Sequence, residues 1–107
     1  MIDWNRVSEL RDEIGAEDFA EVAAAFLEET DNGVAVLDGV PDNRLSPHLH
    51  ALKGSALNLG FAEFAGLCQA GETAARATNP VDRGAIAVCY AASRSAFLVA
   101  LPGLCAS

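Results

Sequence analysis

Apolar side chains recur every three or four residues along almost the whole chain, and this spacing constrains the fold more than any other feature. It is the period of an α-helix that buries one face. Alanine is abundant and β-branched residues are sparse, which also favours helix because alanine has the highest intrinsic helix propensity. The sequence gives no convincing strand signal. It therefore predicts an all-α protein.

Capping and turn residues divide the chain into five predicted helices. Asp3 is suited to cap the first helix and Gly15 to end it. Trp4, Val7, Leu10 and Ile14 would form its apolar stripe. The second helix is expected from about Glu17 to Gly39. Its predicted inward positions are Phe19, Val22, Phe26, Thr30, Val34 and Leu37.

The start of the third helix is open between two interpretations. It begins near Asp42 or Asn43, or it begins with Ser46 as N-cap and Pro47 as the first helical residue. In either case it runs to about Leu59, where Gly60 is expected to end it.

The fourth helix is expected to pass through Phe64 and Cys68 and to fade near Thr78. The fifth is predicted to begin with Asn79 as N-cap and Pro80 as first residue, and to end at Pro102-Gly103. Its predicted inward positions are Ile86, Cys89, Ser93, Phe97 and Ala100. Short connections imply antiparallel neighbours, so we expect an up-down antiparallel four-helix bundle with a short extra N-terminal helix.

Length and charge limit the possible functions. The 107 residues suit one domain over 1–107, and 51% hydrophobic residues suffice for one core. Seven basic and 15 acidic residues give a net charge of −8, which disfavours nucleic-acid and anionic-membrane partners. We expect no membrane-spanning segment and no signal peptide, and hence a cytoplasmic protein. Most of the apolar content fits inside one bundle, which favours a monomer.

The three cysteines, Cys68, Cys89 and Cys105, lie in apolar helical contexts. They are interpreted as small buried residues that stay reduced. Their spacing is too wide for a metal site, so no metal or other cofactor is predicted.

The third predicted helix carries the most informative residues. Its stripe of Leu45, Leu49, Leu52, Ala56 and Leu59 must face the core. At 100° per residue, His50 points away from that stripe and should be exposed. Lys53 and Gly54 fall on the same side, and Leu57 joins them one turn further on as a possible docking residue.

These residue types suit phosphoryl transfer. A neutral imidazole nitrogen can accept a phosphoryl group, and a nearby lysine can stabilise its negative oxygens. A glycine inside a helix costs about 1 kcal/mol relative to alanine, so Gly54 suggests close approach of another surface. On spacing alone, an exposed histidine with a lysine three residues later also fits an ordinary solvated helix surface.

The segment from His50 to Phe61 closely resembles the signature of the histidine phosphotransfer (HPt) family. That signature is a histidine, a Lys-Gly pair at the third and fourth following positions, and a second glycine at the tenth, here Gly60. The continuation through Leu67-Cys68 and Glu72 is similar as well. This resemblance implies a four-helix bundle with an exposed, phosphorylated histidine in the middle of a helix.

The resemblance also assigns site residues. It implies phosphorylation of His50, with Lys53 near the phosphoryl group and Gly54 giving steric access. In several members a polar or acidic residue on the next helix hydrogen-bonds the other ring nitrogen; Glu72 matches best by spacing, with Gln69 one turn earlier. Ser55 matches a small or polar position, and Ser46, Ser55 and Leu57 are predicted to contact partners. His48 is not at the position of the phosphorylated histidine.

The implied function is that of a phosphorelay intermediate without kinase activity of its own. Such a protein accepts the phosphoryl group from a receiver aspartate or a (hybrid) histidine kinase and passes it to a response-regulator receiver domain. Any Mg²⁺ would belong to the receiver. Two alternatives are an unphosphorylated HPt-like module that docks and inhibits a receiver or kinase, and a fragment of a chemotaxis-type kinase. Because the chain begins with Met and ends just past a helix stop, a complete small protein is the simpler expectation.

Overall fold

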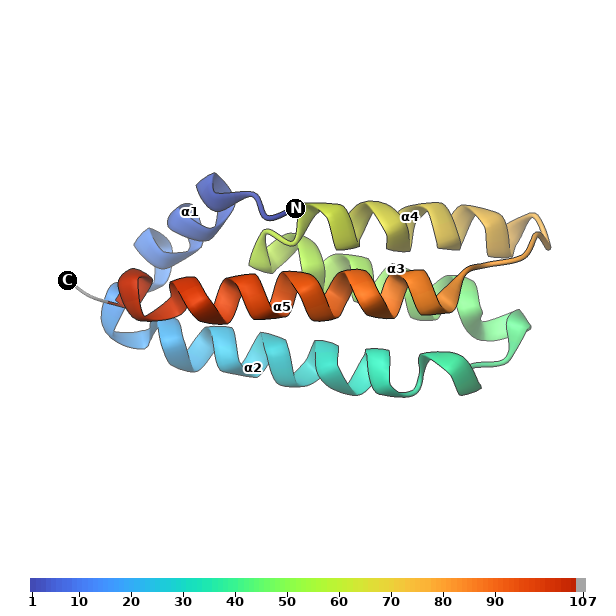
Figure 1. The fold of residues 1–107 in the computed structure, drawn as a ribbon, viewed down its shortest axis with the longest axis horizontal. Helices are drawn as coiled ribbons and strands as arrows, with labels where there is room; N and C mark the ends of the chain where they lie inside the picture. The colour runs from blue at the N-terminus through green and yellow to red at the C-terminus, as the bar shows by residue number, and fades with distance from the viewer. Residues whose placement is uncertain (106–107) are drawn as a thin grey trace.

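The computed structural model describes residues 1–105, and this part of the chain contains five α-helices and no β-strand (Figure 1). The all-α prediction is therefore confirmed. A short 3-10 turn, η1, follows the second helix. The bounds are α1 Trp4–Ile14, α2 Ala16–Ala35, η1 Leu37–Gly39, α3 Asp42–Leu59, α4 Ala62–Arg76 and α5 Arg83–Cys105.

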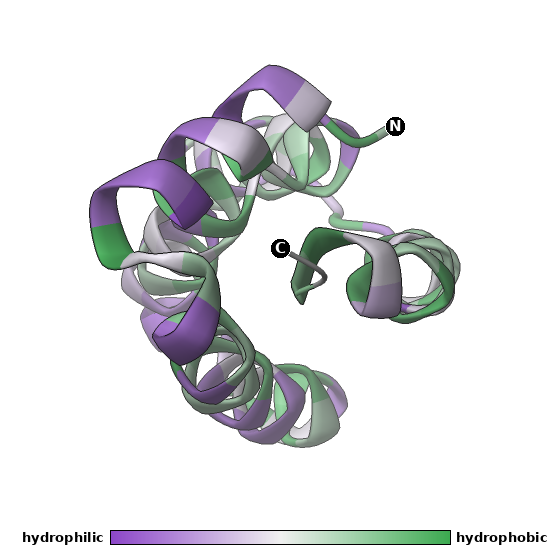
Figure 2. Cartoon of the chain, turned by 90° about the vertical axis from the view of Figure 1, so that its left-hand side faces the viewer, coloured by the Kyte–Doolittle hydropathy of each residue, from purple (hydrophilic) through white to green (hydrophobic). Residues whose placement is uncertain are grey.

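Helices α2 to α5 run lengthwise and surround a common core, as the end-on view also shows (Figure 2). Helix α3 packs against α2 and α4, and α5 packs against the same two helices from the other side. Consequently α3 and α5 lie diagonally opposite one another. Helix α1 packs against α2 and α3 at one end, where Asp3 N donates to the Gly60 carbonyl oxygen at 2.7 Å.

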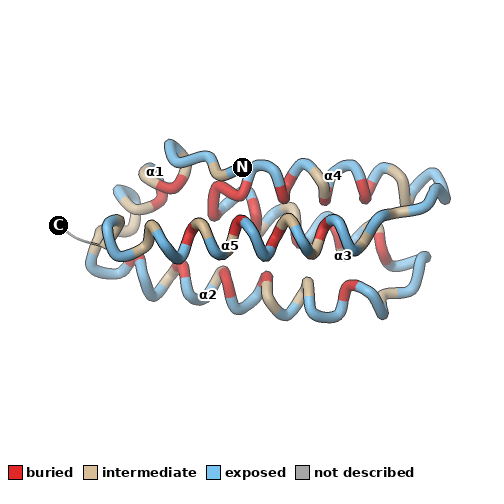
Figure 3. The backbone as a smooth tube through the Cα atoms, in the orientation of Figure 1, coloured by how far each residue is buried: buried red, intermediate tan, exposed pale blue. Residues whose placement is uncertain are grey.

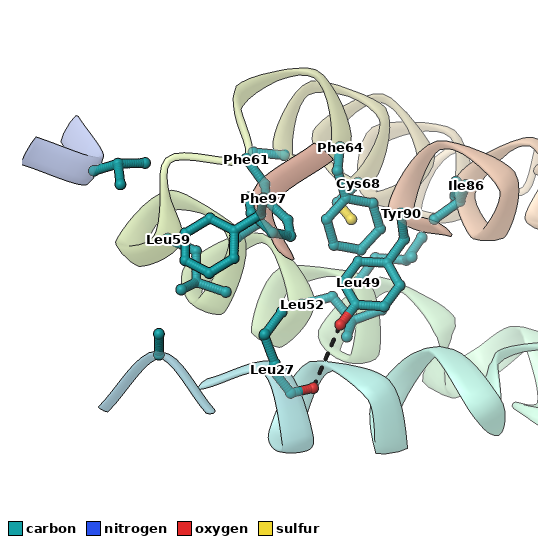
Figure 4. Close-up of a cluster of buried hydrophobic side chains, with 14 of the residues drawn as sticks. Leu27, Leu49, Leu52, Leu59, Phe61, Phe64, Cys68, Ile86, Tyr90 and Phe97 are labelled. Carbon is teal, nitrogen blue, oxygen red and sulfur yellow. Dashed lines mark hydrogen bonds between the residues drawn. The ribbon is translucent and has the colours of Figure 1, made fainter. Parts of the chain in front are cut away.

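Aromatic rings contribute much of the core, and the buried residues face inward along each helix (Figures 3 and 4). Phe61 contacts Phe97 with 5.6 Å between ring centroids, and Phe64 contacts Tyr90 at 5.1 Å. Such tilted contacts add to the free energy gained by burying the rings. Tyr90 also donates its hydroxyl hydrogen to Asp31 Oδ1 at 2.5 Å, which joins α5 to α2.

Two glycines let other helices approach α3 closely. A Cβ at Gly33 of α2 would lie 2.5 Å from Leu52 Cδ2, and a Cβ at Gly71 of α4 would lie 2.8 Å from Leu49 Cδ1. Both distances are too short for a real side chain without a shift of the neighbouring leucine. The α3–α4 pair is the most extensive helix contact of the fold.

The structure also decides how α3 begins. The helix starts at Asp42, so the alternative with Ser46 as N-cap is wrong, and Pro47 lies inside the helix. Pro47 is the sixth residue of the helix, so it lies beyond the four amides that lack a partner in any helix, and it removes one backbone hydrogen bond of the second turn. Gly60 ends the helix in the left-handed conformation, with φ at 77°, as predicted.

Both predicted ends of the last helix are wrong. Helix α5 starts at Arg83 rather than Pro80, and the Asp82 carboxylate accepts a hydrogen bond from Ala85 N at 2.9 Å. The capping role thus falls to an aspartate closer to the helix than Asn79. At the other end α5 continues through Pro102 to Cys105, where the proline removes one backbone hydrogen bond without ending the helix.

In α1, α2 and α5 the buried face differs from the apolar face that the sequence predicted. Trp4 is 43% exposed, because α1 lies across one end of the bundle and buries only Val7 and Leu10. In α2 the buried positions are Phe19, Ala23, Leu27 and Thr30, while Val22, Phe26 and Val34 are half-buried at its edges. In α5, Cys89 and Ala100 are likewise half-buried, and Tyr90 takes the central position.

Helix α5 also corrects the expectation that no segment is long and apolar enough to span a membrane. Among residues 1–105, α5 is long enough and apolar enough to cross a membrane, judged by length and composition alone. In this fold one side of it packs in the core through Ile86, Tyr90, Ser93 and Phe97.

Arg83 fastens the start of α5 to the connection between α2 and α3. Its guanidinium donates to the carbonyl oxygens of Leu37 and Val40 at 2.8 and 2.6 Å, and to Asp42 Oδ1 at 2.8 Å. We expect Arg83→Ala to lower the free energy of unfolding by about 2–3 kcal/mol, because two partly buried carbonyl oxygens lose a charged donor. Urea unfolding measures this. Arg44→Ala, an exposed control, should change stability by less than about 0.5 kcal/mol; equal effects of the two substitutions would contradict the fastening role.

Candidate functional site

Helix α3 separates a buried leucine face from an exposed histidine. Leu45, Leu49, Leu52, Ala56 and Leu59 are all buried, as the helical period requires. The His50 side chain lies on the other side and is 64% exposed. Gly54 and Leu57 are exposed on the same side, and Lys53 is half-buried beside them.

The carboxylate of Glu72 on α4 organises this surface. The side chain is only 2% exposed, and three groups from two helices donate hydrogen bonds to it. His50 Nδ1 lies 3.0 Å from Oε1, Lys53 Nζ lies 3.2 Å from Oε2, and Arg76 Nη2 lies 2.9 Å from Oε1. The close α3–α4 packing at Gly71 brings these groups within reach of one another.

The surroundings of Glu72 determine its charge. Burial acts to raise the pKa of Glu72, but hydrogen bonds from Lys53 and His50, with the charges of both, outweigh it and hold that pKa below its ordinary value. The side chain is therefore ionised at neutral pH.

An ionised Glu72 fixes the tautomer of His50. A carboxylate can only accept, so Nδ1 of His50 carries the hydrogen in their contact. In the neutral ring Nε2 then has the free electron pair. Among the described residues, no protein group forms a hydrogen bond with Nε2.

Lys53 and Gln69 form a second contact between the two helices. Lys53 Nζ donates to Gln69 Oε1 at 2.6 Å, and Gln69 Nε2 donates to Thr73 Oγ1 at 3.3 Å. The family resemblance had offered Gln69 as a partner of the His50 ring, but Gln69 binds Lys53 instead. Its contact holds the lysine ammonium beside Glu72, one helical turn from His50.

Arg76 is a site residue that the sequence analysis missed. Besides its bond to Glu72, its Nε donates to Ser46 Oγ at 3.2 Å, so Ser46 helps to place the guanidinium near His50. The side chain is 68% exposed and can reach a bound anion. Its position four residues after Glu72, on the same face of a helix, was the available signal.

Two helical glycines, one on α3 and one on α4, have no packing requirement. A Cβ added at Gly54 or at Gly66 would have no neighbour within 4 Å. Gly66 is three residues before Gln69 and so lies on the same side of α4. Ser55 is half-buried, and Leu57 is 53% exposed. The surface of α3 one turn from His50 is therefore open at Gly54.

His48 has a different environment. Its Nε2 lies 2.8 Å from the Gly33 carbonyl oxygen on α2, and the side chain is half-buried. This contact supports helix packing. Within residues 1–105, no cluster of three His, Cys, Asp or Glu residues is gathered that could hold a metal ion.

The lowered pKa of Glu72 makes a prediction about stability. A carboxylate whose pKa is depressed by folding contributes stability above its ordinary pKa, 4.5, and loses it as the pH falls through the lower folded value. Glu72→Gln should reduce stability at neutral pH and flatten its decline in acid. Urea unfolding between about pH 3 and 7 measures this. Glu63→Gln, an exposed control on α4, should follow the wild type; parallel curves for all three proteins would contradict it.

The sequence also matches a known protein family. A family model described as the Hpt domain matches residues 5–101, from α1 through most of α5. No curated protein and no solved structure matches significantly. Hpt domains are phosphocarriers rather than kinases in two-component signalling, and they interact with receiver domains and histidine kinases. Because the match covers nearly the whole chain, the chain belongs to the Hpt domain family.

Proposed function

We propose that this protein is a cytoplasmic phosphorelay intermediate that carries a phosphoryl group on Nε2 of His50. One observation carries the proposal: an exposed imidazole whose Nδ1 is bound by a buried, ionised Glu72. The hydrogen bond orients the ring and directs the free electron pair of Nε2 outward. We further propose that residues 1–107 form one domain and that α2 to α5 form an up-down antiparallel bundle. The ring of neighbouring helices and their short connections support this topology.

The proposed transfer is a substitution at phosphorus. The Nε2 electron pair forms the N–P bond while the P–O bond to a receiver aspartate breaks, and the aspartate leaves as a carboxylate. His50 keeps the hydrogen on Nδ1, so the phosphorylated ring is an imidazolium that the Glu72 carboxylate stabilises. In onward transfer, the carboxylate of another receiver attacks phosphorus and the N–P bond breaks.

The charges around His50 suit both acceptance and onward transfer of the phosphoryl group. A buried carboxylate alone would repel the incoming phosphoryl group, but Lys53 and Arg76 are both bound to Glu72. One anion and two cations leave a positive local field for the phosphoryl oxygens. This field stands out on a chain whose net charge is −8. It also favours receiver active sites, which are expected to be acidic because they present an aspartate.

The surface around His50 suits docking of a receiver. Gly54 leaves room one turn from the ring, Gly66 leaves open surface further along α4, and Leu57 offers an exposed apolar contact two turns along α3. We place Ser46 and Ser55 at the margins of this docking surface. A histidine kinase of the hybrid type would use the same surface.

The first test replaces the phosphorylated residue. His50→Gln should abolish acceptance of an acid-labile, base-stable phosphoryl label from phosphorylated receivers, while the far-ultraviolet circular dichroism stays unchanged. His48→Gln is the matched control and should still be labelled, because that ring packs against α2. Labelling of the His50 variant would refute the assignment. A wild type that binds receivers but is never labelled would favour the inhibitory binding module.

A second test separates steric access from folding. Gly54→Leu should lower the transfer rate by more than about tenfold, equivalent to about 1.4 kcal/mol in the barrier, because the side chain obstructs the approach to Nε2. Its stability should be unchanged or higher by up to about 1 kcal/mol, since glycine is a poor helix former. Ala20→Leu, at an exposed position of α2, should leave the transfer rate unchanged. Wild-type transfer by the Gly54 variant would contradict the access argument.

A further inference from the structure

The outward face of α5 is apolar and uncharged along its whole length. Residues 83–105 contain no acidic residue, and both of their arginines are turned toward other parts of the fold. Arg83 binds the α2–α3 connection, and Arg94 forms two hydrogen bonds with Asp31 on α2. The end-on view shows α5 mostly green and white (Figure 2).

Much of this face is open to solvent. Only 22% of the most apolar 18-residue stretch of α5 is buried, and Figure 3 shows the helix largely in pale blue and tan, with short red segments where it packs on the core. Val88 is 71% exposed, Val99 is 84% exposed, and Leu98 is 38% exposed. Apolar surface of this extent on a protein usually marks an interaction site. The expectation of a monomer assumed that such residues lie inside the bundle.

We propose that this face binds the same face of a second copy of the chain, in an antiparallel pair about a twofold axis. Two copies, each with a net charge of −8, repel one another, so their association is least opposed where acidic residues are absent, and α5 is a side of the molecule without acidic residues. A twofold interface needs a self-complementary surface, which an uncharged apolar helix provides.

The available area is sufficient for a dimer. A helix of 23 residues is about 34 Å long, and its outer half, at about 11 Å diameter, presents on the order of 600 Å². Two such faces together present about 1,200 Å² for burial, which reaches the lower end of the range for specific interfaces.

The sequence of α5 favours the antiparallel arrangement. Val88 and Val99 are equally distant from the point between Ser93 and Arg94, and exposed Ala92 and Ser95 lie on either side of that point. In an antiparallel pair Val88 meets Val99 of the other copy. The small side chains at the centre let the two backbones approach closely.

The pair leaves both phosphorylation sites accessible. Helix α3, which carries His50, lies diagonally opposite α5 in each bundle. A bilayer is a poorer occupant, because insertion of α5 would break the contacts of Tyr90 and Arg94 with Asp31. The dimer does not depend on the phosphotransfer proposal. Its test measures the mass of the protein in solution rather than the phosphoryl label.

Sedimentation velocity of the full chain over a range of concentrations tests the dimer. The wild type should approach twice its mass of 11.1 kDa, and Val99→Glu should weaken association at least about tenfold, since the twofold axis introduces the charge twice. Val36→Glu, at an exposed valine outside α5, is the matched control and should associate like the wild type. Circular dichroism checks that the variants fold.

Three results would overturn the dimer. They are a mass of 11.1 kDa at every concentration, an equal weakening of association by Val99→Glu and Val36→Glu, and a monomer that co-sediments with phosphatidylcholine vesicles. The pairing itself is tested by two double variants. Val88→Lys with Val99→Glu should associate more tightly than Val88→Glu with Val99→Glu, because opposite charges then meet across the interface. Equal association of the two double variants would overturn the antiparallel pairing.

Discussion

The buried carboxylate of Glu72 is the interaction on which the site depends. It joins α3 to α4, keeps Nδ1 of His50 protonated, and binds Lys53 and Arg76. A buried anion is costly unless charged donors surround it, and here they hold its pKa below the ordinary value. The same three donors that stabilise the fold therefore prepare an imidazole with a free outward nitrogen.

Packing makes that arrangement possible. Gly71 lets α4 approach Leu49 closely, and the aromatic contacts of Phe61 and Phe64 with α5 keep the other side of α4 in place. The glycines around His50 have the opposite character. Gly54 has no close neighbour within the chain, so its small size serves an approaching surface rather than the core. Helix α4 carries both kinds of glycine, since Gly71 permits helix contact whereas Gly66 leaves open surface.

The bundle has two very different sides. Around His50 the surface carries charged and polar groups with interlocking hydrogen bonds, whereas α5 presents an apolar face without free charge. Since α3 and α5 are diagonal, these surfaces can serve separate partners. A phosphocarrier with such a division can bind a receiver on one side and a second copy on the other, without competition between them.

The sequence by itself determined the all-α class, α1 and its caps, the inward leucines of α3, and the pattern that links His50, Lys53 and Gly54. These features are local, because helical period and capping depend on residues within a few positions. The start of α5, its passage through Pro102, the rotated stripe of α2 and the placement of Arg76 were decided by tertiary structure. They depend on how helices meet, which single-helix periodicity does not contain. The family resemblance suggested Glu72 as the partner of His50, but only the fold brought His50, Lys53 and Arg76 onto its carboxylate, because these residues come from two packed helices.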